Sequence, residues 1–155
     1  MENSTDVFAD SGQLILAMNG VPQSRAYWPM ARAAHMDLHL MSMRRVNLLL
    51  MGTDDVIEDA LARLRPNLRQ PIHAWTPPDP LELPSPKQSG TLILRDVGAL
   101  PQAEQARLFD WLERSAGRYQ VVSTTTSPLL PLVEARAFHD ALFYRLNVVC
   151  VDVTN

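Results

Sequence analysis

Four carboxylates follow a glycine where an apolar run of the sequence ends and a predicted helix begins. They are Asp54, Asp55, Glu58 and Asp59, placed just after Gly52. Carboxylate oxygens gathered in this way can hold a divalent cation, or they can simply complement the partial positive charge of a helix N-terminus. We favour the second interpretation, because acidic residues are the usual occupants of a first helical turn.

A strand, a glycine and a helix in this order also form the arrangement that binds phosphates. That chemistry requires G-x-x-x-x-G-K-[ST], in which glycines let backbone N–H groups surround the phosphates and a lysine contacts them. Gly52 fills the first position, but Ile57 stands at the second glycine and Glu58 at the lysine. The only lysine of the chain is Lys87, so we expect no phosphate cradle here. The carboxylates would also repel a triphosphate.

Other residues with chemical potential have simpler explanations. His35 and His39 stand four residues apart, the spacing of two zinc ligands, but no third ligand is evident, and we interpret them as packing or solvated side chains. Cys150 lies in an apolar run and is expected to be a buried, inert thiol. Trp75 and the prolines after it are interpreted as a connecting loop, although a polyproline-type docking segment is the alternative.

The composition limits the class of protein. At 155 residues, with 46% hydrophobic and 20% charged residues, the chain fits one globular domain. A net charge of −3 leaves no overall electrostatic signature for nucleic acid or an anionic membrane. The N-terminus lacks the basic start of a signal peptide, and the lone cysteine excludes a disulfide within the chain, so we expect a cytoplasmic protein.

Apolar periodicity and turn residues predict alternating strands and helices. Residues 14–18 are predicted as a short strand or docked arm, and 76–90, with five prolines, as a loop. Further strands are expected at 46–51, 92–94, 119–123 and 147–153, and helices at 24–41, from an N-cap at Asp54 to 65, and at 101–114, with 128–144 helical in two pieces. Strands that alternate with helices imply a mainly parallel sheet.

Three stretches of the sequence resemble one family. Residues 138–149 read FHDALFYRLNVV, residues 90–98 read GTLILRDVG, and residues 100–108 read LPQAEQARL. They resemble, in that order, the arginine-finger segment (FRxDLYYRLNV), the Walker B strand (GTLFLDEIG) and the following helix (LPxxxQxxL) of the sigma-54-dependent transcription activators, which are bacterial AAA+ ATPases. The resemblance covers roughly residues 20–152. It implies an α/β, P-loop NTPase-like (AAA+ core) three-layer sandwich with a mainly parallel sheet.

The resemblance also implies which nucleotide-site positions have changed. The Walker A positions fall on Gly52, Thr53, Asp54, Asp55, Glu58 and Asp59. In Walker B, Arg95 stands at the magnesium-organising aspartate and Asp96 at the water-activating glutamate. A cation at a magnesium-ligand position removes the metal site. We hypothesise that Arg95 instead pairs with Asp54 or Asp55 and closes the vacated site.

Three further positions carry over from the family. Thr126 corresponds to the sensor-one asparagine, and the two finger arginines correspond to His139 and Arg145. An arginine finger acts on the γ-phosphate of a neighbouring subunit, so Arg145 would serve a partner's site. An ion pair within the chain, with a residue such as Asp140 or Asp152, is an equal alternative.

We therefore expect a catalytically inactive AAA+ domain that acts as a protein-interaction module in bacterial transcription regulation or signalling, without cofactor or metal. The division expected is an N-terminal arm, 1–19, and a domain, 20–155. The family's sigma-contacting loop, helical lid and DNA-binding domain have no counterpart in the sequence. The partner would be an intact AAA+ activator or a second copy, with no direct DNA binding and no membrane. The alternative is a residual sensor that binds ATP and magnesium.

Overall fold

In the computed structural model, which describes residues 13–15, 30–32 and 45–153, seven strands form one sheet in the order β2-β1-β7-β3-β6-β5-β4. Five of them run parallel: β3 (Leu48–Met51), β4 (Ile72–Trp75), β5 (Gly90–Leu94), β6 (Tyr119–Thr125) and β7 (Val149–Asp152). The prediction of an α/β fold with a mainly parallel sheet is confirmed.

Two short strands extend the sheet beside β7. Strand β1 (Gln13–Ile15) runs antiparallel to β7, and β2 (Met30–Arg32) runs antiparallel to β1. The strand expected near residues 14–18 is thus present, and it belongs to the sheet. The helix predicted over 24–41 is wrong at 30–32, because pairing with β1 outweighs the local helical spacing of apolar residues. The rest of that range, with His35 and His39, lies outside the described residues.

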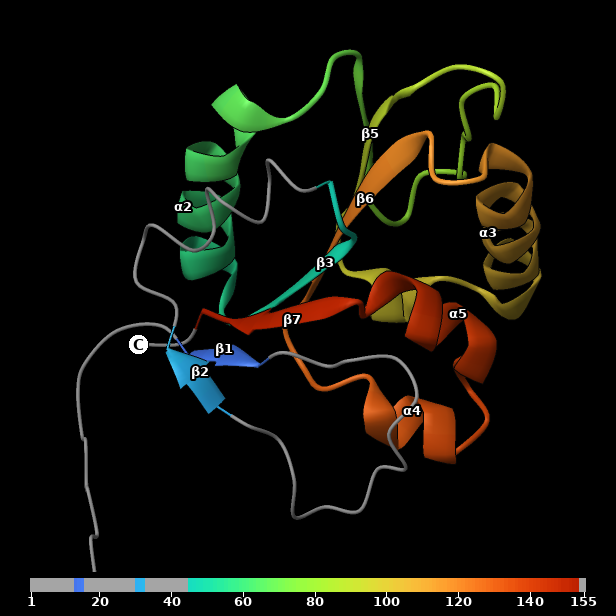
Figure 1. The fold of residues 1–155 in the computed structure, drawn as a ribbon. Coiled ribbons are helices and arrows are strands. Elements are labelled where there is room, and N and C mark those ends of the chain that lie inside the picture. Colours follow the sequence, from blue (N-terminus) through green and yellow to red (C-terminus); the bar gives the residue numbers. More distant parts are fainter. Residues whose placement is uncertain (1–12, 16–29, 33–44, 154–155) are drawn as a thin grey trace, which may run out of the picture.

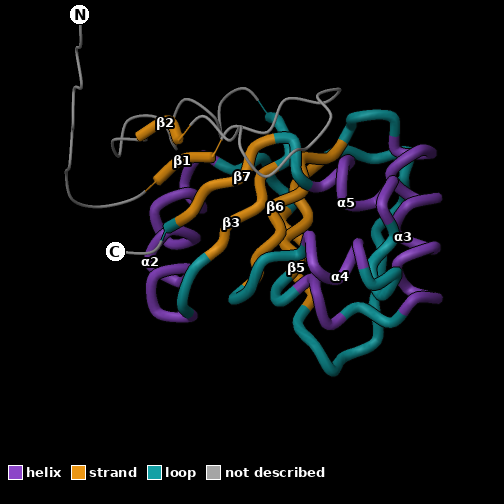
Figure 2. The backbone as a smooth tube through the Cα atoms, turned by 90° about the horizontal axis from the view of Figure 1, so that it is seen from below, coloured by secondary structure: helices purple, strands orange, loops and turns teal. Residues whose placement is uncertain are grey.

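Helices cover both faces of the sheet (Figures 1 and 2). On one face lies α2 (Asp54–Leu64), which continues into a 3₁₀ turn, Arg65–Asn67. The other face carries α3 (Gln102–Ser115), α4 (Leu130–Glu134) and α5 (Asp140–Leu146). A further 3₁₀ turn, Val97–Ala99, follows β5. These three layers agree with the predicted sandwich.

The alternation of side chains along each strand divides the core into two halves. Leu48 and Leu50 pack with Ile57 and Leu61 of α2, whereas Leu49 packs in the cluster that holds Trp111 of α3. Successive strand residues point to opposite faces, so a strand covered on both sides must be apolar at every position. This requirement explains the continuous apolar runs that identified β3 and β5 in the sequence.

Helix ends agree with the sequence signals. Helix α2 gives way to the 3₁₀ turn that contains Pro66, as predicted, while its N-cap is Thr53, one residue before the Asp54 that was expected. Helix α3 ends at Ser115; its C-cap, Ala116, adopts a left-handed conformation with φ of 49°, and Gly117 follows with φ of 75°. Since positive φ values strain residues with a Cβ, Gly117 is suited to this stop.

Candidate functional site

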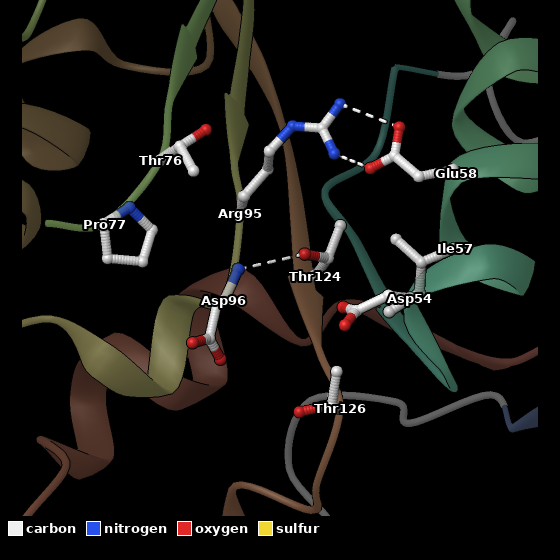
Figure 3. A pocket seen from close by; sticks show the side chains of 9 residues that line it. All are labelled: Asp54, Ile57, Glu58, Thr76, Pro77, Arg95, Asp96, Thr124 and Thr126. Carbon is white, nitrogen blue, oxygen red and sulfur yellow. Dashed lines mark hydrogen bonds and ion pairs between the residues drawn. The ribbon is translucent and has the colours of Figure 1, made fainter. Parts of the chain in front are cut away.

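A pocket of about 280 Å³ lies at the edge of the sheet where four parallel strands end. Residues that follow β3, β4 and β5 line it together with the end of β6 (Figure 3). They are Asp54, Ile57, Glu58, Thr76, Pro77, Arg95, Asp96, Thr124 and Thr126. Ligands of open α/β sheets bind at this edge, so the pocket is the candidate functional site.

The structure brings most of the predicted site residues into this pocket. Asp54, Glu58, Arg95, Asp96 and Thr126 all line it. Of the other Walker A positions, Gly52 is buried and its N–H donates to the carbonyl of Thr125 at 3.2 Å, which joins β3 to β6. Thr53, Asp55 and Asp59 are exposed and are not among the lining residues. Asp59 pairs instead with Arg63 at 2.7 Å.

The connection between β3 and α2 is only two residues long. Strand β3 ends at Met51, Gly52 and Thr53 follow, and α2 begins at Asp54. The first bond of the helix runs from the N–H of Ile57 to the carbonyl of Thr53 at 2.9 Å. The stretch expected to correspond to a phosphate-binding loop is thus largely helical. Glu58, at the lysine position, lies in the second turn of α2.

Arg95 and Glu58 form an ion pair through both guanidinium Nη atoms. Nη2 of Arg95 donates to Oε2 of Glu58 at 3.2 Å, and Nη1 contacts Oε1 (Figure 3). The side chains are 28% and 55% exposed. The predicted partners, Asp54 and Asp55, are wrong. Because α2 already begins at Asp54, the carboxylate facing the end of β5 comes from one turn later.

Asp96 is held in an unusual backbone conformation. Its φ of 46° is left-handed, which aspartate tolerates better than most residues. Its N–H donates to Oγ1 of Thr124 at 3.0 Å. In Figure 3 its carboxylate points away from the pair formed by Arg95 and Glu58. Within the described part of the chain, no group of three histidine, cysteine or acidic side chains is arranged to hold a metal ion.

Asp55 is stabilised in its charged form beside the pocket. The hydroxyl of Thr53 donates to Oδ1 of Asp55 at 2.5 Å. This bond, supported by the N–H of Val56, lowers the pKa of the Asp55 carboxyl below its ordinary value of 3.8. Asp55 therefore remains ionised at the N-terminus of α2, as the interpretation of these acids as helix-complementing residues requires.

The arginine-finger positions lie at the N-cap of α5, His139, and in its last turn, Arg145, and they do not line the pocket. Arg145 forms an ion pair with Glu113 of α3, with both side chains about half exposed. This confirms an ion pair within the chain, but with a different partner from the Asp140 or Asp152 considered from the sequence. His139 is the N-cap of α5, where its Nδ1 accepts a hydrogen bond from the N–H of Leu142 at 3.4 Å.

Gln105 is the glutamine of the LPxxxQxxL stretch, but sequence reasoning gave it no structural role. Its side chain is 2% exposed, and its Nε2 donates to the carbonyls of Leu100 and Ala137 at 2.9 and 3.1 Å. Its Oε1 accepts from the N–H of His139 at 2.8 Å. A glutamine inside an apolar helix face was the available signal. Gln105 joins the start of α3 to the start of α5.

The proline-rich loop is bonded to the protein's own core. Nε1 of Trp111 donates to the carbonyl of Pro84 at 2.7 Å. The hydroxyl of Tyr119 donates to the backbone carbonyl of Ser85 at 3.2 Å. Trp75 is buried, and its Nε1 donates to the carbonyl of Asp79 at 2.6 Å. These contacts favour the connecting-loop interpretation over a segment that offers Trp75 for docking. Thr76 and Pro77 of this loop were also missed as pocket residues, because β4 was not predicted.

Comparison with known proteins identifies relatives at the level of family and fold. A profile described as the sigma-54 interaction domain matches residues 33–155. No curated protein sequence matches the chain significantly.

Among the described helices, none has the length and apolar character needed to cross a membrane.

Solved structures with the same fold include one protein bound to nucleotides. NtrX from Brucella abortus in complex with ADP superposes with a TM-score of 0.62 at 16% identity, over 77% of this chain and 34% of that one. Its complex with ATP gives a TM-score of 0.59 at 17% identity, over 84% and 39%. The P-loop NTPase domain of the sigma-54 transport activator from E. coli gives 0.51 at 17% identity, over 70% and 97%. The chain thus spans little more than a third of NtrX.

Proposed function

Since the chain belongs to the sigma-54 interaction domain family, we propose that it is a catalytically inactive member that acts as a protein-interaction module in bacterial transcription regulation or signalling. On this proposal the pocket at the carboxyl edge of the sheet no longer hydrolyses ATP. The domain then works through the surfaces that its fold presents, in the cytoplasm and without a cofactor or metal.

The observation that carries the proposal is the ion pair of Arg95 with Glu58. Set on the family's motifs, Glu58 replaces the lysine that contacts phosphates and Arg95 replaces the aspartate that organises magnesium. Both charges are reversed, and the two reversed groups neutralise each other. A guanidinium engaged in this way offers no ligand to magnesium, and a carboxylate repels the phosphates that the lysine would attract.

Two other features of the pocket support the proposal. Its lining carries three carboxylates, Asp54, Glu58 and Asp96, against the single guanidinium of Arg95. This balance disfavours a triphosphate. The two-residue connection of Gly52 and Thr53 is also too short to form the glycine-rich loop whose N–H groups surround a phosphate. At about 280 Å³ the pocket is smaller than the roughly 300–1,000 Å³ of most small-molecule sites.

Isothermal titration with ATP and magnesium tests the inactive site directly. We expect no heat of binding at micromolar ATP, and micromolar affinity would overturn the proposal. The variant Arg95→Ala is titrated beside the wild type. It removes the guanidinium of the ion pair and leaves the β3–α2 connection unchanged. We expect it to remain without ATP affinity as well.

The partner side of the proposal rests on the face formed by α3 and α5. Arg145 stands there about half exposed, and the family uses this segment between subunits. We propose an intact AAA+ activator as the partner. A pull-down from the native cell with the wild-type chain should recover such an activator, and Arg145→Ala should not. Arg107→Ala is the control, since Arg107 is an exposed arginine of α3 that pairs with Glu104 within its own helix.

A residual ATP sensor is the second candidate. It is favoured by the position of the pocket and by the hydroxyls of Thr76, Thr124 and Thr126 in its lining. The two candidates differ in the titration, because only a sensor would bind ATP. They also differ in the pull-down, since a sensor's partner should change when ATP is added.

A further inference from the structure

Exposed cations gather at the edge of the sheet opposite the pocket, where the parallel strands begin. Their places follow from the topology, since each lies next to a strand start or at the end of α2 (upper end of Figure 1). They are Arg45 before β3, Arg65 at the end of α2, Arg69 before β4, Lys87 before β5 and Arg118 before β6. We call these five residues the basic edge.

Hydrogen bonds connect the segments that carry the basic edge. The N–H of Gly90 donates to the carbonyl of Arg118 at 3.4 Å. The hydroxyl of Thr91 donates to the carbonyl of Arg69 at 2.8 Å. An Nη1 donor of Arg118 reaches the carbonyl of Pro86, beside Lys87, at 3.4 Å. The charges of Arg69, Lys87 and Arg118 thus belong to segments that are bonded to one another, and the N–H of Leu68, beside Arg69, donates to the carbonyl of Arg65 at 3.2 Å.

The carboxylates in the last two turns of α3, the helix that precedes Arg118, are already paired with other arginines. Asp110 pairs with Arg114 at 2.9 Å, and Glu113 pairs with Arg145. Among the residues that the structure describes, none of the five cations of the basic edge forms an ion pair. The basic edge is therefore left without a counter-charge in the described part of the chain.

The opposite edge of the sheet carries exposed acids. Asp54 and Asp55 begin α2, Asp79 follows β4, and Asp96 follows β5. We call these four residues the acidic edge. The neighbouring Glu58 and Asp59 are each paired with an arginine, as described above. In the described part of the chain, cations without an ion pair thus lie where the parallel strands begin, and acids without an ion pair lie where these strands end.

We propose that the basic edge of one copy of this chain binds the acidic edge of a second copy, so that copies associate head to tail. The two surfaces are complementary in charge and lie at opposite ends of one rigid sheet, which makes the contact heterologous rather than two-fold symmetric. A nucleic acid fits the molecule less well, because its net charge is −3 and the acidic edge would repel phosphates.

Sedimentation velocity with a pair of variants tests the association. One variant, Arg65→Gln with Arg69→Gln, weakens the basic edge, and the other, Asp54→Asn with Asp79→Asn, weakens the acidic edge. At about 50 mM salt the wild-type chain should associate, and each variant should associate at least about tenfold more weakly. An equimolar mixture should restore a one-to-one dimer, because each variant keeps the edge that the other has lost. Arg107→Gln is the control for charge removal elsewhere on the surface.

Carbodiimide coupling identifies the contact itself, because Lys87 is the only lysine of the chain. In a mixture of ¹⁴N- and ¹⁵N-labelled copies, Lys87 of one copy should couple to Asp54, Asp55, Asp79 or Asp96 of the other. Circular dichroism of each variant checks that it is folded. The proposal fails if the wild type remains monomeric at low salt, if both variants associate as the wild type does, or if the mixture stays monomeric.

A fluorescent DNA duplex provides the remaining comparison. If the wild type binds the duplex and Arg65→Gln with Arg69→Gln does not, the basic edge serves a nucleic acid and the head-to-tail proposal is overturned. All association and DNA-binding samples are prepared without nucleotide. Their outcome therefore does not depend on whether the chain binds ATP, which the titration measures. Binding of ATP would overturn the inactive-site proposal and leave the association intact.

Discussion

The carbonyl oxygen of the buried Gln105 side chain accepts a hydrogen bond from the backbone N–H of His139 at 2.8 Å. This bond joins the two stretches of sequence that most resemble the sigma-54 activators, the helix after β5 and the segment that leads into α5. The two stretches thus stabilise each other's position in the fold, which gives both of them a structural role. Retention of the motifs does not by itself require that they still act on a nucleotide.

Gln105→Leu should lower the free energy of unfolding by about 2–4 kcal/mol. The substitution leaves the carbonyls of Leu100 and Ala137 and the N–H of His139 without their buried partner. Urea denaturation measures the change. Gln102→Leu is the control, because Gln102 also lies on α3 and donates to the carbonyl of Arg136 but is exposed. This substitution should lower the free energy of unfolding far less than Gln105→Leu does. Equal losses in the two variants would contradict the role of Gln105.

Arg95→Asp should destabilise the domain, because it places a second carboxylate beside Glu58. The double variant Arg95→Asp with Glu58→Lys should recover most of the loss by restoring an opposite-charge pair. Given the exposure of both side chains, the coupling in a double-mutant cycle should be about 0.5–1 kcal/mol. Thermal stability of Arg95→Asp equal to or above that of the wild type would refute the idea that this pair closes the site.

Thr53→Val should raise the pKa of the Asp55 carboxyl toward 3.8, because the hydroxyl that stabilises its charged form is removed. A depressed pKa in the folded state adds stability above pH 3.8, and that stability is lost as the pH falls through the lower folded value. The variant should therefore be less stable than the wild type at neutral pH, and the difference should vanish in strong acid.

The pKa of Asp55 is measured by NMR titration of its side-chain carboxyl carbon. Thr53→Ser is the control, since it keeps the hydroxyl that donates to Asp55. An unchanged pKa in Thr53→Val, with Thr53→Ser also unchanged, would show that the hydroxyl does not control this group.

Trp111→Phe should release the proline-rich loop from α3. The indole Nε1 that donates to the carbonyl of Pro84 is lost, at a cost of about 1–3 kcal/mol. Endoproteinase Lys-C reports the release, because it cuts after lysine and Lys87 lies in this loop. Cleavage should become severalfold faster in Trp111→Phe and stay unchanged in Tyr144→Phe, where the ring is exposed. Equal rates in all three proteins would count against the anchoring of the loop.

The fold could be predicted from the sequence because buried strands and capped helices leave local signals. The apolar runs of β3 and β5 and the stop at Gly117 are examples. Strand β4, Ile72–Trp75, was missed because a four-residue strand at the edge of a sheet has no continuous apolar run. At residues 30–32 the helical spacing of neighbouring side chains gave the wrong element, since the strand there depends on a partner distant in sequence.

The members of the site could be predicted better than their contacts. The resemblance identified Glu58, Arg95 and Asp96 as changed positions, and all three line the pocket. It did not identify the partner of Arg95, which depends on where α2 begins. The partner of Arg145, Glu113, lies on another helix and leaves no local pattern. Pairings of this kind are decided by tertiary packing, and sequence spacing does not encode them.

The pairing of β1 with β7 has a consequence for how the chain folds during synthesis. Gln13 lies opposite Asp152, although 138 residues separate them. Strand β3, near the centre of the sheet, likewise finds its neighbours only when β6 and β7 have been made. Contacts between residues so far apart in the sequence form slowly during folding. We therefore expect the nascent chain to expose its most apolar strand on the ribosome until almost all of the domain has emerged, and to depend on chaperones during that interval.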